Sequence, residues 1–236
     1  MLYVPDLRTV ELEPWPQQGG SGVFLKQDAS GASNDCCVRE IPAGGALAPK
    51  RQPFDETIYV LDGRGSTAVW TEGASKVTFE WKADALFGIP LNAWHQHFNG
   101  SGKDAARFFS VTNAPVTSAE SDGAPPNVNL VADALNLPLM YTGERGGGRL
   151  DLSMAKGRMK SRITQFPAGA STSERTLGSG GHVIVMSGEG FSLMWPDGAE
   201  PLRFECKRGT MVVPPAAWRH QQFNTGRTPL RCLAFE

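Results

Sequence analysis

Histidine and cysteine are scarce in this sequence of 236 residues, which contains four of each. The cysteines are Cys36, Cys37, Cys206 and Cys232. No pair of them has the Cys-x-x-Cys spacing of a zinc ribbon or a redox motif, so they are expected to be reduced thiols of a cytoplasmic protein. The histidines are His95, His97, His182 and His220. Any imidazole chemistry of this protein must therefore use one of these four side chains.

The sequence also lacks an excess of charge of either sign and any long apolar run. Its 23 Lys and Arg residues nearly balance 24 Asp and Glu residues, which disfavours binding to nucleic acid or to an anionic membrane. No apolar run is long enough to span a membrane, and the first residues do not form a signal peptide. Because a Gly-rich phosphate loop, a nucleophile elbow and a dinucleotide fingerprint are all missing, no nucleotide or flavin cofactor is expected.

The sequence contains two copies of one unit. When residue n is placed over residue n+125, residues 41–99 align with residues 166–224 without a gap, and 17 of the 59 pairs are identical. Glycine-containing turns divide each copy into short β-rich segments. Short strands at even spacing predict an all-β chain with two antiparallel barrels.

The remaining residues are expected to flank and join the two barrels. Residues 1–40 are predicted to form an N-terminal arm that pairs with the edge of one barrel. Barrel 1 is predicted over 41–114, a linker over 115–160 and barrel 2 over 161–236. Within the linker, residues 129–135 have helical spacing after an asparagine at a capping position, which predicts a short helix between the barrels.

Both copies contain the spacing of the two cupin motifs. The first motif is Gly, five residues, His-x-His, three or four residues, Glu, six residues and Gly. Copy 1 has this spacing from Gly44 to Gly63 and keeps Glu56, but Lys50 and Gln52 occupy the two histidine positions. The second motif, Pro, four residues, His, three residues and Asn, is present over residues 90–99 and 215–224.

The chain therefore resembles a bicupin of the gentisate 1,2-dioxygenase-like kind, in the cupin superfamily. The resemblance implies two double-stranded β-helix (jelly-roll) barrels that arose by internal duplication. It also implies a small-molecule enzyme, a metal-dependent dioxygenase-like oxidoreductase that acts on a small aromatic, hydroxy- or oxo-acid. The active site is expected in barrel 1.

The ligand set of such a metal can be named from the motif positions. In cupins the ligands project into the barrel mouth, and strand alternation places His97 on the same face as His95. His95, His97 and Glu56 would form the two-histidine, one-carboxylate set of non-haem iron oxygenases, and Gln52 would add a neutral oxygen ligand. The metal would be Fe, Mn or Zn, and Glu56 and His95 would also be the catalytic residues.

A metal-free interpretation of the same residues stays open. The ammonium group of Lys50 repels a divalent cation, and it can replace the metal by pairing with Glu56. In this alternative, barrel 1 binds or senses a small acidic metabolite. It can also be a metal-independent lyase or isomerase, in which His95 or Glu56 is the general base.

Barrel 2 lacks a carboxylate in the motif positions. Arg175 and Leu177 replace the His-x-His pair, and Gly181 replaces the glutamate. Arg175, His220 and Gln222 form a group rich in hydrogen-bond donors that is expected to hold a substrate carboxylate. The alternative is that Arg175 is a solvated surface residue and that barrel 2 is structural.

Two residues of barrel 1 are assigned to substrate binding. Both copies place a basic side chain, Lys50 or Arg175, in the first histidine position, which indicates a shared role in anion recognition. Trp94 lies next to a motif histidine and is expected to line an apolar or aromatic pocket. The expected partners are a small-molecule acid and, because edge strands need to be covered, a second copy of the chain in a homodimer.

Overall fold

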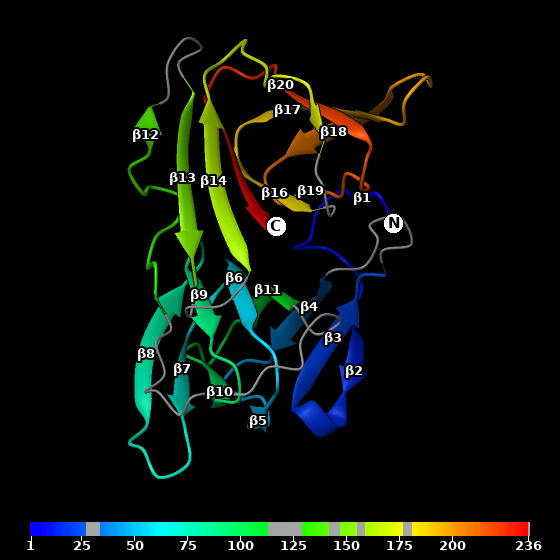
Figure 1. Ribbon diagram of the computed structural model, residues 1–236. Helices are drawn as coiled ribbons and strands as arrows, with labels where there is room; N and C mark the ends of the chain where they lie inside the picture. The colour runs from blue at the N-terminus through cyan, green and yellow to red at the C-terminus, as the bar shows by residue number, and fades with distance from the viewer. Residues whose placement is uncertain (27–33, 113–128, 142–146, 155–158, 177–180, 236) are drawn as a thin grey trace.

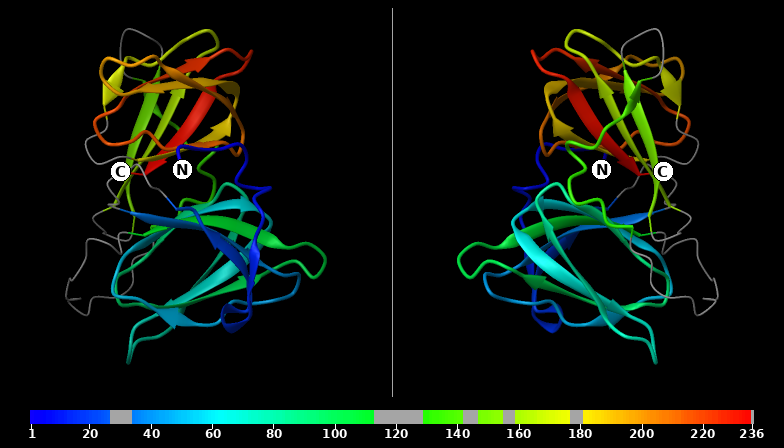
Figure 2. Two further views of the ribbon diagram at one scale, coloured as in Figure 1. Left: turned by 90° about the vertical axis from the view of Figure 1, so that its right-hand side faces the viewer. Right: turned by 90° about the vertical axis from the view of Figure 1, so that its left-hand side faces the viewer.

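A computed structural model describes residues 1–26, 34–112, 129–141, 147–154, 159–176 and 181–235. These residues form two β-barrels, one above the other, and both chain ends lie near the level where the barrels meet (Figures 1 and 2). The helical structure of the described residues is one short 3-10 turn, η1 (Pro16–Gln18). No helix in these ranges is long and apolar enough to cross a membrane.

Barrel 1 consists of two facing antiparallel sheets. Its strands are β2 (Glu13–Trp15), β3 (Gly20–Phe24), β4 (Asp35–Ile41), β5 (Lys50–Arg51), β6 (Glu56–Asp62), β7 (Arg64–Trp70), β8 (Val77–Lys82), β9 (Leu86–Ile89), β10 (Trp94–Asn99) and β11 (Ala106–Thr112). The six-stranded sheet has the order β2-β3-β4-β11-β6-β9, and the four-stranded sheet has the order β5-β10-β7-β8. The inward side chains of the two sheets form the core of the barrel.

Barrel 2 repeats this arrangement. Its strands are β1 (Tyr3–Val4), β12 (Met140–Tyr141), β13 (Gly148–Ser153), β14 (Lys160–Phe166), β15 (Arg175–Thr176), β16 (His182–Ser187), β17 (Glu189–Trp195), β18 (Leu202–Lys207), β19 (Met211–Val212), β20 (Arg219–Asn224) and β21 (Leu230–Phe235). The seven-stranded sheet has the order β1-β19-β16-β21-β14-β13-β12, and the four-stranded sheet has the order β15-β20-β17-β18. Five strands of barrel 1 (β4, β5, β7, β8 and β10) have counterparts whose bounds are shifted by 125 residues. The predicted duplication and all-β architecture are confirmed.

The predicted N-terminal arm is more than an edge addition. β4 lies inside the larger sheet of barrel 1 and pairs with β11 along its whole length. Its alternate side chains point to two different cores, with Ile41 inside barrel 1 and Val38 between the barrels. A strand buried on both faces has no polar alternation, and for this reason the sequence pattern did not reveal it. A strand from the predicted linker, β13, likewise belongs to a barrel, because it pairs with β14 in the larger sheet of barrel 2.

The helix predicted over residues 129–135 is wrong. Val131 instead forms an isolated β-bridge with Leu86, and the two residues exchange backbone hydrogen bonds of 2.8 and 2.9 Å. The amide of Ala134 donates to the carbonyl oxygen of Asp84. So short a segment has little helical stability of its own, and tertiary hydrogen bonds to barrel 1 determine its conformation. Residues 113–128 of the predicted linker lie outside the described residues.

A third core joins the two barrels. The outward faces of the central strands of the two larger sheets pack against each other, and the contact includes Val38, Tyr59, Phe109, Ile184 and Phe235, all at most 3% exposed. Polar groups add to this contact, because Arg208 of barrel 2 donates two hydrogen bonds, of 2.8 and 3.0 Å, to the carboxylate of Asp84. The central strands of the two larger sheets are therefore buried on both faces.

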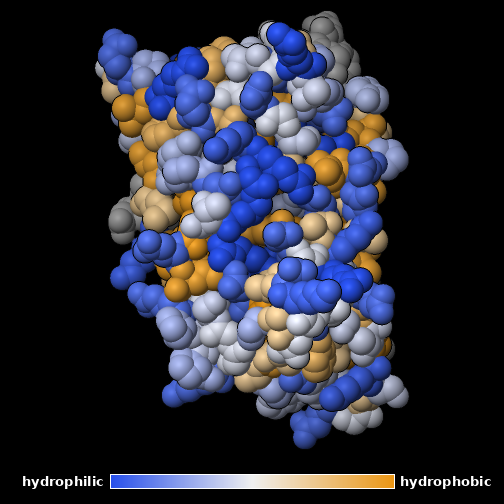
Figure 3. Space-filling model, turned by 180° about the vertical axis from the view of Figure 1, so that it is seen from behind, coloured by the Kyte–Doolittle hydropathy of each residue, from blue (hydrophilic) through white to orange (hydrophobic). Residues whose placement is uncertain are grey.

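The expected homodimer stays a prediction. Figure 3 shows one face of the molecule, on which hydrophobic residues lie in separate patches between hydrophilic ones. At one edge of the barrel 2 sheet, β12 exposes Met140 and Tyr141, which are 72% and 73% exposed.

The burial of His182 in β16 predicts that the stability of the protein depends on pH. Its ring lies beside Phe109 at the barrel–barrel contact, with ring centroids 6.1 Å apart, and burial lowers the pKa of His182 to about 4. The unfolded chain binds a proton at this residue below about pH 6.5, and the folded chain does so only near pH 4. The free energy of unfolding must therefore fall as the pH falls through this window. At pH 4.5 the His182 contribution is expected to be about 2 kcal/mol less favourable than at pH 7.

Urea unfolding at pH 7 and pH 4.5, measured for the wild type and for His182→Gln, tests this expectation. The variant should lose less stability on acidification than the wild type, by about 2 kcal/mol. Since the other histidines are present in both proteins, the difference between them isolates His182. Equal losses in the two proteins would contradict the prediction.

Candidate functional site

Polar side chains from both sheets meet inside barrel 1. On β10 the side chains alternate, so that His95 and His97 are buried in the interior, as the strand pattern predicts. The pairing of β5 with β10 places Lys50 opposite His95. Arg39 on β4 and Glu56 on β6 come from the opposite sheet.

Trp94 does not take part in this interior cluster, and its predicted role in substrate binding stays a prediction. It lies on the other face of β10, opposite Trp70 of β7. The two indole rings stack with centroids 6.2 Å apart and planes inclined by 10°. Because neighbouring residues of a strand point to opposite faces, the inward position of His95 excludes an inward Trp94.

Glu56 is the centre of the cluster and is fully buried. Its Oε2 accepts hydrogen bonds from Lys50 Nζ and Gln52 Nε2, each at 3.0 Å. Its Oε1 lies 3.9 Å from the guanidinium of Arg39 and has no hydrogen-bond partner among the described residues. Burial alone would raise the pKa of Glu56, but the charges of Lys50 and Arg39 outweigh it and hold the pKa well below 4.5. Glu56 is therefore ionised.

His95 presents an unprotonated nitrogen to Glu56. Its Nδ1 lies 3.4 Å from the carbonyl oxygen of Ala93, which can only accept, so that Nδ1 carries the proton. Burial lowers the pKa of His95 to about 4, so the ring is neutral at pH 7. Its Nε2 lies 3.6 Å from Glu56 Oε2 and has no hydrogen-bond partner in the described part of the chain. Two acceptors therefore face each other inside the barrel.

A cavity of about 350 Å³ opens onto this cluster. Arg39, Lys50, Gln52 and His97 line it, together with apolar residues that include Leu47. Nε of Arg39 and Nε2 of His97 are buried and have no hydrogen-bond partner among the described residues. Two cations, Arg39 and Lys50, line the cavity, and the buried carboxylate of Glu56 forms ion pairs with both. Their net charge of +1 favours an anion in the cavity.

Comparison with solved structures identifies the architecture. A deletion mutant of Bacillus subtilis oxalate decarboxylase, a bicupin, superimposes with a TM-score of 0.71 at 11% sequence identity. The superposition covers all of this chain and 76% of the other. The chain has the fold of a bicupin.

A second structural neighbour of this chain is the Bacillus subtilis oxalate decarboxylase whose Mn(II) centres were characterised. It has the same TM-score, 0.71, at 12% identity, and the superposition again covers 100% of this chain and 76% of the neighbour. No protein-family model matches the sequence. No curated protein is similar to it by sequence.

The residues of barrel 1 in this bicupin do not fit a divalent metal. Lys50 and Gln52 already donate to the glutamate oxygen that a metal would use, and Arg39 adds a second positive charge beside it. Gln52 presents its amide N–H to Glu56, whereas a metal ligand would present oxygen. Within the described residues, no group of three His, Cys, Asp or Glu side chains could hold a metal. Lys50 thus supplies a positive charge to the carboxylate that a metal would need as a ligand.

Barrel 2 of the bicupin keeps the geometry of this site but not its chemistry. Arg175 lies opposite His220, just as Lys50 lies opposite His95, and His220 and Gln222 are buried in the interior. Arg175 itself is exposed and lines a cavity of about 390 Å³ with several hydroxyl side chains. Gly181 supplies no carboxylate. The role of Arg175, His220 and Gln222 in substrate binding stays a prediction.

Sequence reasoning missed Arg39, Thr67 and Trp81. Arg39 lies upstream of both motifs, in the predicted N-terminal arm. Thr67 Oγ1 lies 2.8 Å from His97 Nδ1, and Trp81 Nε1 donates to the same hydroxyl at 2.8 Å. One available signal was the alternation of β7, which places Thr67 on the same face as Val69 in the core.

Proposed function

We propose that barrel 1 of this bicupin binds a small carboxylic acid without a divalent metal and that His95 and Glu56 exchange a proton with it. The observation that carries the proposal is the charge of the cavity. Arg39 and Lys50 together exceed the single negative charge of Glu56, and one bound carboxylate would make the cluster neutral. The proposed reaction is that of a lyase or isomerase acting on a hydroxy- or oxo-acid.

The proton chemistry is assigned to His95 because its Nε2 is unprotonated and 3.6 Å from Glu56. The low pKa of His95 applies to the protein when no anion is bound. A bound carboxylate adds a negative charge nearby and raises this pKa towards neutrality, where a histidine is an effective base. The carboxylate of Glu56 then stabilises the protonated ring.

The competing function is the metal-dependent, dioxygenase-like oxidoreductase implied by the motif resemblance. One observation favours it: His95 Nε2 and Glu56 Oε1 are both buried without hydrogen-bond partners in the described residues, as metal-ligating atoms would be. Titration of the untagged protein with Mn(II), Fe(II) or Zn(II) separates the two functions. Stoichiometric binding that is lost in Glu56→Ala and His95→Ala would support the oxidoreductase.

A cytoplasmic location is retained as a prediction.

Acid recognition can be measured with paired probes. We expect isothermal titration calorimetry to detect binding of at least one of oxalate, pyruvate and benzoate, and weaker binding of its methyl ester. The substitution Lys50→Met should weaken binding of the acid by about tenfold or more, because it removes a charge-assisted hydrogen bond. Binding of the ester should change by less than about twofold.

The duplication offers a matched control for this experiment. Arg175→Met makes the same change at the equivalent position of barrel 2 and should leave acid binding in barrel 1 unaltered. The proposed function would be contradicted by equal losses for acid and ester in Lys50→Met, or by no binding of any of the acids.

A further inference from the structure

His97 lies at the end of a buried chain of three side chains. Trp81 Nε1 donates to Thr67 Oγ1 at 2.8 Å, and the same oxygen lies 2.8 Å from His97 Nδ1. All three side chains are nearly inaccessible, with Trp81 at 5%, Thr67 at 0% and His97 at 2% exposure. We call Trp81, Thr67 and His97 the indole–hydroxyl–imidazole relay.

The donors and acceptors available in the relay determine which atom donates in each hydrogen bond. An indole N–H can only donate, so the Thr67 oxygen accepts from Trp81. The hydroxyl has one proton of its own, and the remaining partner of its oxygen in the described structure is His97 Nδ1. If Nδ1 instead carried a proton and donated, the Thr67 hydroxyl would be a buried donor without an acceptor. Thr67 therefore donates to His97 Nδ1.

We propose that Trp81 and Thr67 are positioning residues that hold His97 in the tautomer protonated at Nε2, so that His97 donates a hydrogen bond to the bound acid. In this tautomer Nε2 has no lone pair for a metal. His97 lines the same cavity as Arg39 and Lys50, and Nε2 has no partner among the described residues. A carboxylate or carbonyl oxygen in the cavity is the acceptor that this buried N–H lacks.

The neighbouring histidine has the opposite tautomer. His95 is protonated at Nδ1, which leaves its Nε2 as an acceptor, whereas His97 presents Nε2–H as a donor. One imidazole donor and one imidazole acceptor therefore lie on the same strand inside barrel 1, where His97 lines the cavity and His95 is buried beside Glu56. This pairing suits an acid that has both an acceptor oxygen and a proton to lose, which is the class named in the proposed function.

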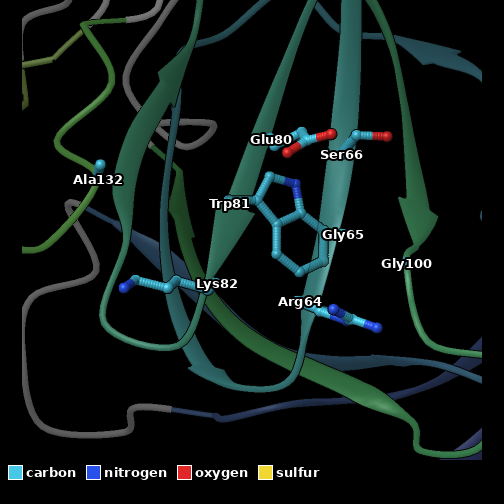
Figure 4. A pocket seen from close by; sticks show the side chains of 8 residues that line it. All are labelled: Arg64, Gly65, Ser66, Glu80, Trp81, Lys82, Gly100 and Ala132. Carbon is cyan, nitrogen blue, oxygen red and sulfur yellow. The ribbon is translucent and has the colours of Figure 1, made fainter.

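The local packing is built to hold Trp81 in place. Gly65 lies against the indole, since a Cβ atom there would come within 2.5 Å of two ring carbons. Trp81 and Gly65 lie side by side among the residues that line a second cavity, of about 460 Å³ (Figure 4). Trp81 lines this second cavity and also donates a hydrogen bond to Thr67, so one end of the relay reaches the second cavity.

Barrel 2 provides an internal comparison. The positions equivalent to Thr67, Trp81 and His97 are Ser192, Cys206 and Gln222. The Ser192 hydroxyl has no hydrogen-bond partner in the described residues, and the Cys206 thiol instead lies 3.6 Å from the carbonyl oxygen of Phe204. Among the described residues, the relay is therefore found in barrel 1, which contains the charged cavity, and not in barrel 2.

The tautomer of His97 is directly measurable by NMR. In protein labelled with ¹⁵N-histidine, ¹H–¹⁵N correlation spectra should show a protonated Nε2 and an unprotonated Nδ1 for His97, assigned by comparison with His97→Gln. Thr67→Val, which replaces the hydroxyl with a methyl group, should produce a mixture of tautomers, and Thr67→Ser should restore the wild-type spectrum. A wild-type His97 that is protonated at Nδ1 would overturn the proposal.

The second readout is acid affinity, and this part rests on the proposed function. Binding of the acid found by calorimetry should weaken about tenfold in Thr67→Val and recover in Thr67→Ser. Trp81→Phe keeps most of the packing but removes the indole N–H, and it should shift the tautomer ratio in the same direction. If no acid binds while the tautomer is as expected, the proposed function fails and the relay stands. If the acid binds and Thr67→Val leaves both readouts unchanged, the relay fails alone.

Discussion

A double variant, Lys50→His/Gln52→His, is expected to bind one equivalent of Mn(II) that the wild-type protein does not bind. The two substitutions complete the His-x-His spacing of the first cupin motif, in which Glu56 is already present. They also remove the ammonium group that donates to the Glu56 carboxylate at 3.0 Å. His95 Nε2, which is unprotonated and buried, becomes available as a further ligand. Three imidazoles and one carboxylate are a set that binds first-row divalent metals.

Isothermal titration calorimetry and metal analysis of dialysed protein measure this gain. The affinity for Mn(II) is expected to rise on the order of 100-fold or more over the wild type. The matched control is Arg175→His/Leu177→His, which makes the same motif repair in barrel 2. It should gain little affinity, because Gly181 supplies no carboxylate there. Tight binding of Mn(II) to the wild-type protein would refute our interpretation of Lys50 as the replacement for a metal.

Arg39→Leu is expected to weaken acid binding by about 100-fold, the largest loss from any single substitution in the cavity. The Arg39 side chain has only 10% of its surface exposed, and its Nε has no hydrogen-bond partner among the described residues. A carboxylate at this position would form a charge-assisted bond in an environment with little water, where such bonds are strongest. Glu56 keeps Lys50 and Gln52 as partners in this variant, so the fold should remain intact.

Calorimetric titration of Arg39→Leu with the acid and its methyl ester tests the prediction, and circular dichroism verifies the fold. Arg64→Leu serves as the control, because Arg64 is an exposed arginine of the same barrel that lines the second cavity together with Trp81. It should bind the acid as the wild type does. Unchanged acid binding in Arg39→Leu would exclude this cavity as the acid site.

The sequence predicted the fold well because the signals for it are local and repeated. Glycines and short β-rich segments recur 125 residues apart, and five strand pairs have this spacing in the structure. The segment over 129–135 was misassigned because its conformation depends on Leu86 and Asp84, which are distant in sequence. A seven-residue helical spacing carries little information against such contacts.

The candidate site was predicted only in part. Lys50, Gln52, Glu56, His95 and His97 were found from motif spacing, and the structure brings all five together. Arg39 was missed because it contributes to the cavity across the barrel, from a strand that no motif marks. The closeness of Trp94 to His95 in sequence does not place the two side chains together, because adjacent residues of a strand point to opposite faces.

The contact between the two larger sheets limits which residues of barrel 2 can be replaced. The same strands that carry Arg39 and Glu56 on one face carry Val38 and Tyr59 on the other, packed against barrel 2. Barrel 2 is thus required to cover the back of the sheet that carries Arg39 and Glu56, whether or not its own interior binds a ligand. Its mouth, around Arg175, can accept new side chains at little cost, while its back, around Ile184 and Phe235, cannot. A duplicated barrel of this kind is a support that leaves one opening available for a new ligand.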